Sequence, residues 1–143
     1  MARLLKIQCQ INPGRSLAIS PKIVKKTVEK ILILLKIKEA DISIAFIDCG
    51  QIRKLNKTYR GKNSATDVLS FPYYHQKNYL SGEIIISWPQ VKKNAAKEKI
   101  SPFSELNKVL VHSLLHLIGY DHQKEAETIL MRKKEREIIS KIK

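Results

Sequence analysis

Three of the four histidines in the chain fall within eleven residues, in the pattern His112-x-x-x-His116-x-x-Gly119-x-x-His122. Residues four apart lie on one face of an α-helix, so His112 and His116 can offer ring nitrogens to a single ion. His122 can join them only if the chain turns back, and Gly119 suits the left-handed conformation that such a turn requires. The pattern therefore predicts a helix that ends near Gly119 and a metal site at its last turn.

Three imidazole ligands favour zinc and leave the fourth tetrahedral position to water, as in catalytic zinc sites. We therefore expect one Zn²⁺ per chain, held by His112, His116 and His122. The alternative is that these histidines serve packing or contact phosphates. His75 stands alone in a tyrosine-rich stretch that we expect to be a loop, and it is not expected to bind the metal.

The ligand spacing also matches that of the metzincin proteases, whose general base is a glutamate directly after the first histidine. Here that position is Ser113. A serine hydroxyl cannot accept a proton at neutral pH as a carboxylate can, so a peptidase is the less favoured alternative.

Apolar periodicity predicts an α+β (α/β-like) fold with a single mixed sheet of about four strands covered by helices, which would carry a zincin-like three-histidine site. We expect one domain over residues 1–143. Ser20 and Ser104 are the expected N-caps of the first and of the histidine-bearing helix. The expected strands are 6–11, 42–46, 68–71 and 83–87, and the expected helices are 21–36, 52–59, 88–99, 104–118 and one from 124 onward.

The chain carries 27 Lys and Arg against 13 Asp and Glu, a net charge of +14. A positive field of this size attracts polyanions such as nucleic acid, although lysine-rich surfaces also serve solubility alone. Cys9 and Cys49 form no Cys-x-x-Cys pair, which argues against a disulfide framework and a thiolate zinc site. Because no apolar run is long enough to span a membrane, we expect a cytoplasmic protein without a membrane partner.

A second motif lies upstream, where Arg60-Gly61 is followed by Thr66-Asp-Val-Leu-Ser-Phe-Pro72. Together with the histidine motif and Gly82-Glu-Ile-Ile-Ile-Ser87, it resembles the YbeY family of bacterial metal-dependent endoribonucleases over most of the chain. One departure stands out, since Ser113 occupies the position where that family usually has glycine.

The resemblance implies a zinc-dependent endoribonuclease specific for single-stranded RNA, acting in ribosomal RNA processing, in 3′-end maturation of 16S rRNA and in ribosome quality control. The implied partners are single-stranded RNA, 16S rRNA and the small ribosomal subunit. Arg60 matches the functional arginine of the family and suits a phosphate, so the candidate catalytic residues are Arg60, His112 and His116. A non-catalytic, zinc-stabilised ribosome-assembly factor is the alternative.

Several polar residues have less specific expected roles. Asp121 could orient a ligand ring or cap a turn, and Thr66, Asp67 and Ser70 could hold their own loop. No general base is evident, so attack by water and by the 2′-hydroxyl of the RNA both remain open. The residues that could line an RNA path are Lys92, Lys93, Lys97 and Lys99, with Tyr73, Tyr74 or Tyr79 stacking on bases.

Overall fold

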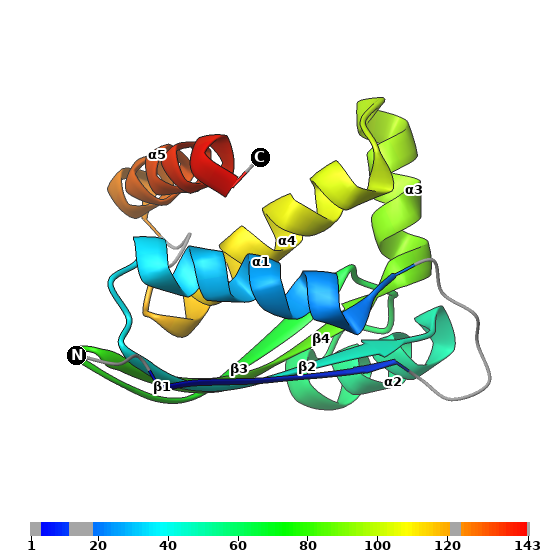
Figure 1. The fold of residues 1–143 in the computed structure, drawn as a ribbon. Helices are drawn as coiled ribbons and strands as arrows, with labels where there is room; N and C mark the ends of the chain where they lie inside the picture. Colours follow the sequence, from blue (N-terminus) through cyan, green and yellow to red (C-terminus); the bar gives the residue numbers. More distant parts are fainter. Residues whose placement is uncertain (1–3, 12–18, 121–123, 143) are drawn as a thin grey trace.

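The protein is described by a computed structural model that covers residues 4–11, 19–120 and 124–142. Strands and helices alternate in the first part of the chain, and helices alone follow from residue 88 (Figure 1). The elements are β1 (Leu4–Ile11), α1 (Pro21–Leu34), β2 (Glu39–Ile47), α2 (Cys49–Arg60), β3 (Val68–Gln76), β4 (Tyr79–Ser87), α3 (Trp88–Glu98), α4 (Pro102–Leu117) and α5 (Glu125–Ile142).

The four strands form one mixed sheet in the order β1-β2-β4-β3. β1, β2 and β4 run parallel, whereas β3 pairs with β4 as an antiparallel hairpin. β3 therefore lies at one edge of the sheet and contains Pro72, at an irregularity in the register. Proline has no N–H to donate, so an edge strand is the place where a sheet tolerates it.

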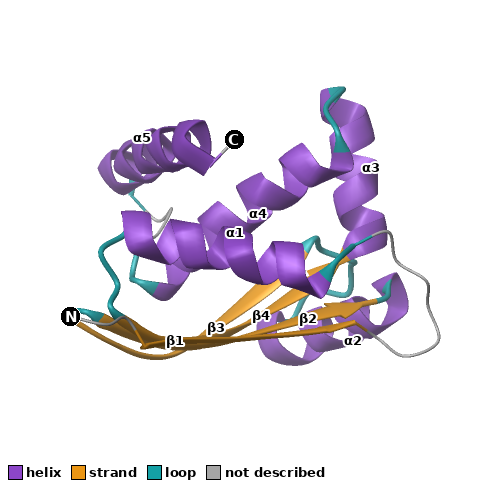
Figure 2. Ribbon diagram, in the orientation of Figure 1, coloured by secondary structure: helices purple, strands orange, loops and turns teal. Residues whose placement is uncertain are grey.

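Helices lie on both faces of this sheet (Figure 2). α1 and α4 cover one face, α5 packs on both of these helices, and α2 covers part of the other face. The main core fills the space between the sheet and the α1/α4 layer. A small second cluster joins Ile52 of α2 to Leu69 and Ile85 of the sheet. The predicted α+β fold with a mixed four-stranded sheet is confirmed.

Several helix ends follow the sequence rules, and one expected cap is wrong. Ser20 caps α1 through the Ile23 N–H, as predicted. The cap of α4 is Ser101 and not Ser104, because Pro102 already occupies the first helical position and the Ser101 hydroxyl accepts from the Ser104 N–H.

The β3–β4 hairpin is longer than its apolar runs suggested. β3 continues to Gln76 and β4 begins at Tyr79, so His75 lies on a strand and not in the expected loop. Backbone pairing continues through residues whose side chains are mostly exposed. Their sequence therefore lacks the apolar alternation that would predict a strand. No described helix is long and apolar enough to cross a membrane.

Candidate active site

α4 carries two of the three predicted zinc ligands on its pocket side. Its opposite side is fixed in the core by fully buried Leu110, Leu114 and Leu115. Burying one leucine side chain contributes about 1.5–3 kcal/mol, so this packing holds the helix firmly against the sheet. His112 and His116, only partly buried, therefore project from a rigid support.

The rings of His112 and His116 converge as ligands of one ion would. Their Nε2 atoms lie 3.0 Å apart, and their planes meet at 79°. Two nitrogens at about 2.0–2.1 Å from one tetrahedral zinc ion would be about 3.3 Å apart, close to the observed distance. A hydrogen bond between two neutral imidazoles would also fit this distance.

The third predicted ligand, His122, and its neighbour Asp121 lie outside the described residues. Among the residues that are described, no three His, Cys, Asp or Glu side chains form a metal-binding group. Gly119 is described and has the left-handed φ of +104° expected for a chain that turns after α4. The donor chemistry and the Nε2 spacing of the pair thus fit zinc, and the three-histidine site stays a prediction.

A carboxylate from α5 faces the other side of the His112 ring. The Glu135 Oε1 atom lies 3.6 Å from His112 Nδ1, with 19% of the Glu135 side chain exposed. This distance is too long for a hydrogen bond but places an acceptor where an Nδ1–H would point. A proton on Nδ1 leaves the Nε2 lone pair free, and Nε2 is the atom that faces His116.

Arg60 is the last residue of α2, and the helix end determines its position. The Asp48 carboxylate caps the N-terminus in a capping box with Gln51. At the other end Gly61 has a φ of +70°, and the N–H groups of Gly61 and Lys62 donate to the Lys57 and Asn56 carbonyls. Only glycine adopts this conformation cheaply, so Gly61 stops the helix directly after Arg60.

The loop after Arg60 is tied back to α2 by side chains. The buried Asn56 amide donates to the Ser64 carbonyl at 2.9 Å, and Arg53 Nε donates to Asn63 Oδ1 at 2.9 Å. The segment then enters β3 with Asp67, whose carbonyl accepts from the Ser87 N–H. These bonds fix the loop between Arg60 and β3.

Hydroxyl and amide groups hold the Asp67 side chain as well. The Thr66 hydroxyl donates to Asp67 Oδ1, and the Asn94 amide donates to Oδ2, each at 3.4 Å. The bond between Thr66 and Asp67 confirms the local role predicted for these two residues, whereas the Asn94 bond ties Asp67 to α3.

A pocket of about 820 Å³ brings Arg60 and the two histidines together. Its walls come from the end of α2, from residues 66–72, from one face of α4 and from Glu135 on α5. Like Glu135, the lining residues Tyr59, Glu105 and Lys108 were missed by sequence reasoning. Glu105 is 7% exposed, and burial raises the pKa of its carboxyl despite the nearby Lys108 ammonium.

The other sequence-predicted residues lie elsewhere or face inward. Ser113 is fully buried and donates its hydroxyl to the Val109 carbonyl at 2.7 Å, so it neither lines the pocket nor acts as a base. None of the residues expected to contact RNA is among the described pocket residues. The lysine and the aromatic residues that do line the pocket are Lys108, Tyr59 and Phe71. The expected residues were Lys92, Lys93, Lys97, Lys99, Tyr73, Tyr74 and Tyr79.

Comparison with known proteins decides the family. The family model described as Endoribonuclease YbeY matches residues 10–143. The chain belongs to the YbeY endoribonuclease family. The motifs that carried the resemblance to this family contain Arg60, Ser70, Phe71 and the histidine pair.

Individual relatives agree with membership of the YbeY family. Endoribonuclease YbeY of Caldanaerobacter subterraneus subsp. tengcongensis is 35% identical over 149 residues, which cover 94% of this chain and 92% of the relative. That of Persephonella marina is 38% identical over 131 residues, 88% of this chain and 86% of the relative. The solution structure of TM1509 from Thermotoga maritima is similar with a TM-score of 0.67 and 26% identity, covering 95% of this chain and 88% of that one.

Proposed function

We propose that the chain is a zinc-dependent endoribonuclease that cleaves single-stranded RNA in ribosomal RNA processing, including 3′-end maturation of 16S rRNA, and in ribosome quality control. The observation that carries the proposal is the convergence of two histidine Nε2 atoms in a pocket that Arg60 also lines. Membership of a family whose curated relatives are named endoribonucleases supports it, as does the net charge of +14.

His112, His116 and His122 would hold the zinc ion. When bound, zinc supplies a Lewis acid beside the phosphodiester. Glu135 acts on the ligand and not on the RNA, since its carboxylate faces His112 Nδ1 and favours the tautomer that frees Nε2.

Arg60 would bind the phosphate. Its planar guanidinium can hold two phosphoryl oxygens at once and can stabilise the extra negative charge that develops during cleavage. Lys108 adds a second positive charge to the same pocket.

Glu105 is not placed to activate a nucleophile at the histidines. It lies seven residues before His112 on α4, which is about 10 Å along a helix axis. The 2′-hydroxyl of the RNA and water are the two candidate nucleophiles, and the product ends distinguish them, because internal attack leaves a 2′,3′-cyclic phosphate.

Cleavage of an end-labelled single-stranded RNA carrying the 3′ region of 16S rRNA tests the proposal. We expect His116→Ala and Arg60→Ala to lose cleavage while circular dichroism shows native helix content. The matched controls are His75→Ala on β3 and Arg132→Ala on α5, exposed residues outside the pocket, which should cut like the unaltered chain.

A different result would favour the assembly-factor alternative. If the unaltered, zinc-loaded chain leaves the RNA intact, or if folded His116→Ala cuts equally well, intrinsic cleavage is refuted.

We also propose a cytoplasmic location with the small ribosomal subunit as partner, since Cys9 and Cys49 are free thiols, as expected in a reduced compartment.

A further inference from the structure

Two aromatic rings form one corner of the pocket, next to Arg60. Tyr59 lies at the end of α2 and is 64% exposed, whereas Phe71 lies on β3 and packs against the Ile52–Leu69–Ile85 cluster. Their ring centroids are 5.3 Å apart with planes at 73°. This edge-on contact supports the Tyr59 ring from one side and leaves most of the residue open to solvent.

We propose that Tyr59, supported by Phe71, is a stacking platform for one unpaired nucleobase beside the phosphate that Arg60 binds. This inference rests on the proposed function, because it assigns a base subsite to the same RNA site. Tyr59 and Arg60 are consecutive and both line the pocket, so they can hold the base and the phosphate of adjoining positions along one strand. Exposed aromatic rings next to cationic side chains are the usual means of binding single-stranded nucleic acid.

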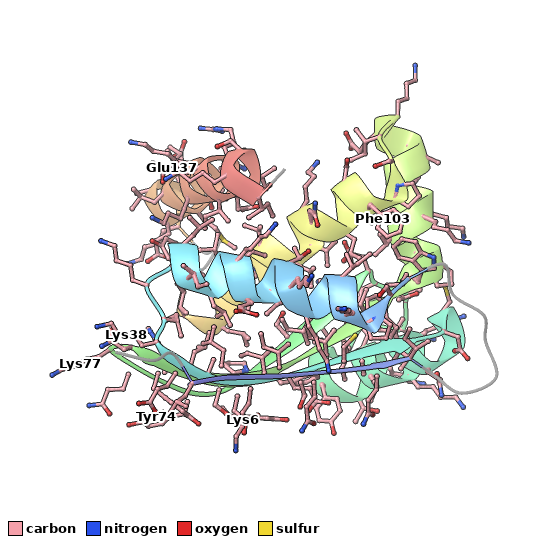
Figure 3. All side chains as sticks on the ribbon, viewed as in Figure 1. Lys6, Lys38, Tyr74, Lys77, Phe103 and Glu137 are labelled. Atoms are coloured by element: carbon pink, nitrogen blue, oxygen red, sulfur yellow. The ribbon has the colours of Figure 1, made fainter. Side chains whose placement is uncertain are left out.

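The other exposed tyrosines are committed to other contacts. The Tyr73 hydroxyl donates to the Glu83 carboxylate at 2.6 Å, and Tyr73 is not among the described pocket residues. Tyr74 donates its hydroxyl to Gln76 and packs on Tyr79. Figure 3 shows Tyr74 on the side of the sheet away from α1, near Lys77 at the hairpin turn.

The platform gives a physical reason for a preference for single strands. In a duplex both faces of each base are covered by neighbouring base pairs, so no face is available to the Tyr59 ring. An unpaired base can be turned out and stacked without breaking a pair. Tyr59 is thus inferred to be a specificity-determining residue.

Binding of a short single-stranded RNA by the zinc-loaded protein tests the inference by fluorescence anisotropy. Loss of one base–aromatic stack weakens binding about 5- to 150-fold. We expect this loss for Tyr59→Leu, which keeps an apolar side chain without a ring. Tyr59→Phe, which keeps the ring, and Tyr74→Leu, an exposed tyrosine outside the pocket, should stay within about twofold of the unaltered chain.

The RNA supplies a second arm of the test, and its first step needs only the unaltered chain. Abasic nucleotides placed one at a time along the strand should reveal one position where the loss of a base weakens binding to the unaltered chain by a similar factor. The same abasic RNA should cost Tyr59→Leu nothing further, because both changes remove one contact. A 2-aminopurine at that position should lose fluorescence on binding to the unaltered chain and not on binding to Tyr59→Leu.

Three outcomes would overturn the inference. If the unaltered chain cuts RNA while Tyr59→Leu binds single strands as tightly, the platform is wrong and the proposed function stands. Equal weakening of single-stranded and duplex RNA would refute the assigned preference. If the unaltered chain neither binds nor cuts single-stranded RNA, the proposed function fails and the inference fails with it.

Discussion

Glu135→Gln tests whether the α5 carboxylate prepares His112 for zinc. The substitution keeps the size and one oxygen of the side chain and removes its charge. Because Glu135 Oε1 lies 3.6 Å from His112 Nδ1, the charge that is lost is the one facing the ring that would donate electron density to the metal. We expect Glu135→Gln to bind zinc more weakly while keeping its fold.

The size of the effect follows from the distance and the exposure of the pair. Two unit charges about 4 Å apart attract by about 1 kcal/mol in water and by about 4 kcal/mol near a protein surface. The imidazole carries only part of a unit charge, and the side chains of His112 and Glu135 are 32% and 19% exposed, so the value lies between these limits. The expected loss is about 1.4–2.7 kcal/mol, or about 10- to 100-fold in zinc affinity.

Competition between the protein and a chromophoric chelator at fixed pH measures this affinity. Glu137→Gln is the matched control, because Glu137 lies on the same helix, points outward in Figure 3 and pairs with Lys134 at 3.7 Å. Equal zinc affinity of Glu135→Gln and Glu137→Gln would refute the orienting role. A complete absence of zinc binding by the unaltered chain would refute the metal site itself.

Three further substitutions test the structural reasoning. Gly61→Ala should lower the free energy of unfolding in urea by about 1–2 kcal/mol, because a φ of +70° strains a residue that has a Cβ. No atom lies within 4 Å of the added Cβ to offset this strain by a contact, and an unchanged free energy of unfolding would contradict the prediction. Ser113→Ala should change stability by less than about 1 kcal/mol and leave cleavage intact, since the Ser113 hydroxyl only returns to the Val109 carbonyl; a loss of cleavage would place Ser113 in the site. Burial raises the pKa of Glu105 above its ordinary 4.5, so the folded chain binds this proton more tightly than the unfolded chain, and stability falls as pH rises above that value. Glu105→Gln should lessen this fall in thermal melts between about pH 4 and 7, and parallel curves would show that the shift is absent.

The elements with strong apolar periods could be predicted from the sequence, and the strand order could not. Alternation marked β1 and β2, and a serine–proline pair marked the start of α1. The order β1-β2-β4-β3 depends on pairing between distant segments, which no local pattern encodes. The β3 extension was missed because its side chains are exposed on both faces of an edge hairpin.

The same division applies to the candidate site. The i, i+4 spacing predicted that ring nitrogens of His112 and His116 lie close together, and their Nε2 atoms are 3.0 Å apart. Glu105 could have been found as well, since it lies two helical turns before His112 on the same face of α4. Tyr59 directly precedes Arg60, and this adjacency could have indicated it. Glu135 reaches the pocket only through the packing of α5, so its sequence position gave no indication of it.

The position of α5 in the chain has a consequence for the timing of assembly. During synthesis the residues of the sheet and of the Arg60 loop become available before those of α4 and α5. The histidine pair gains its facing carboxylate only when α5 docks on α4. The surroundings of the histidine pair are therefore the part of the candidate site that is completed last along the chain.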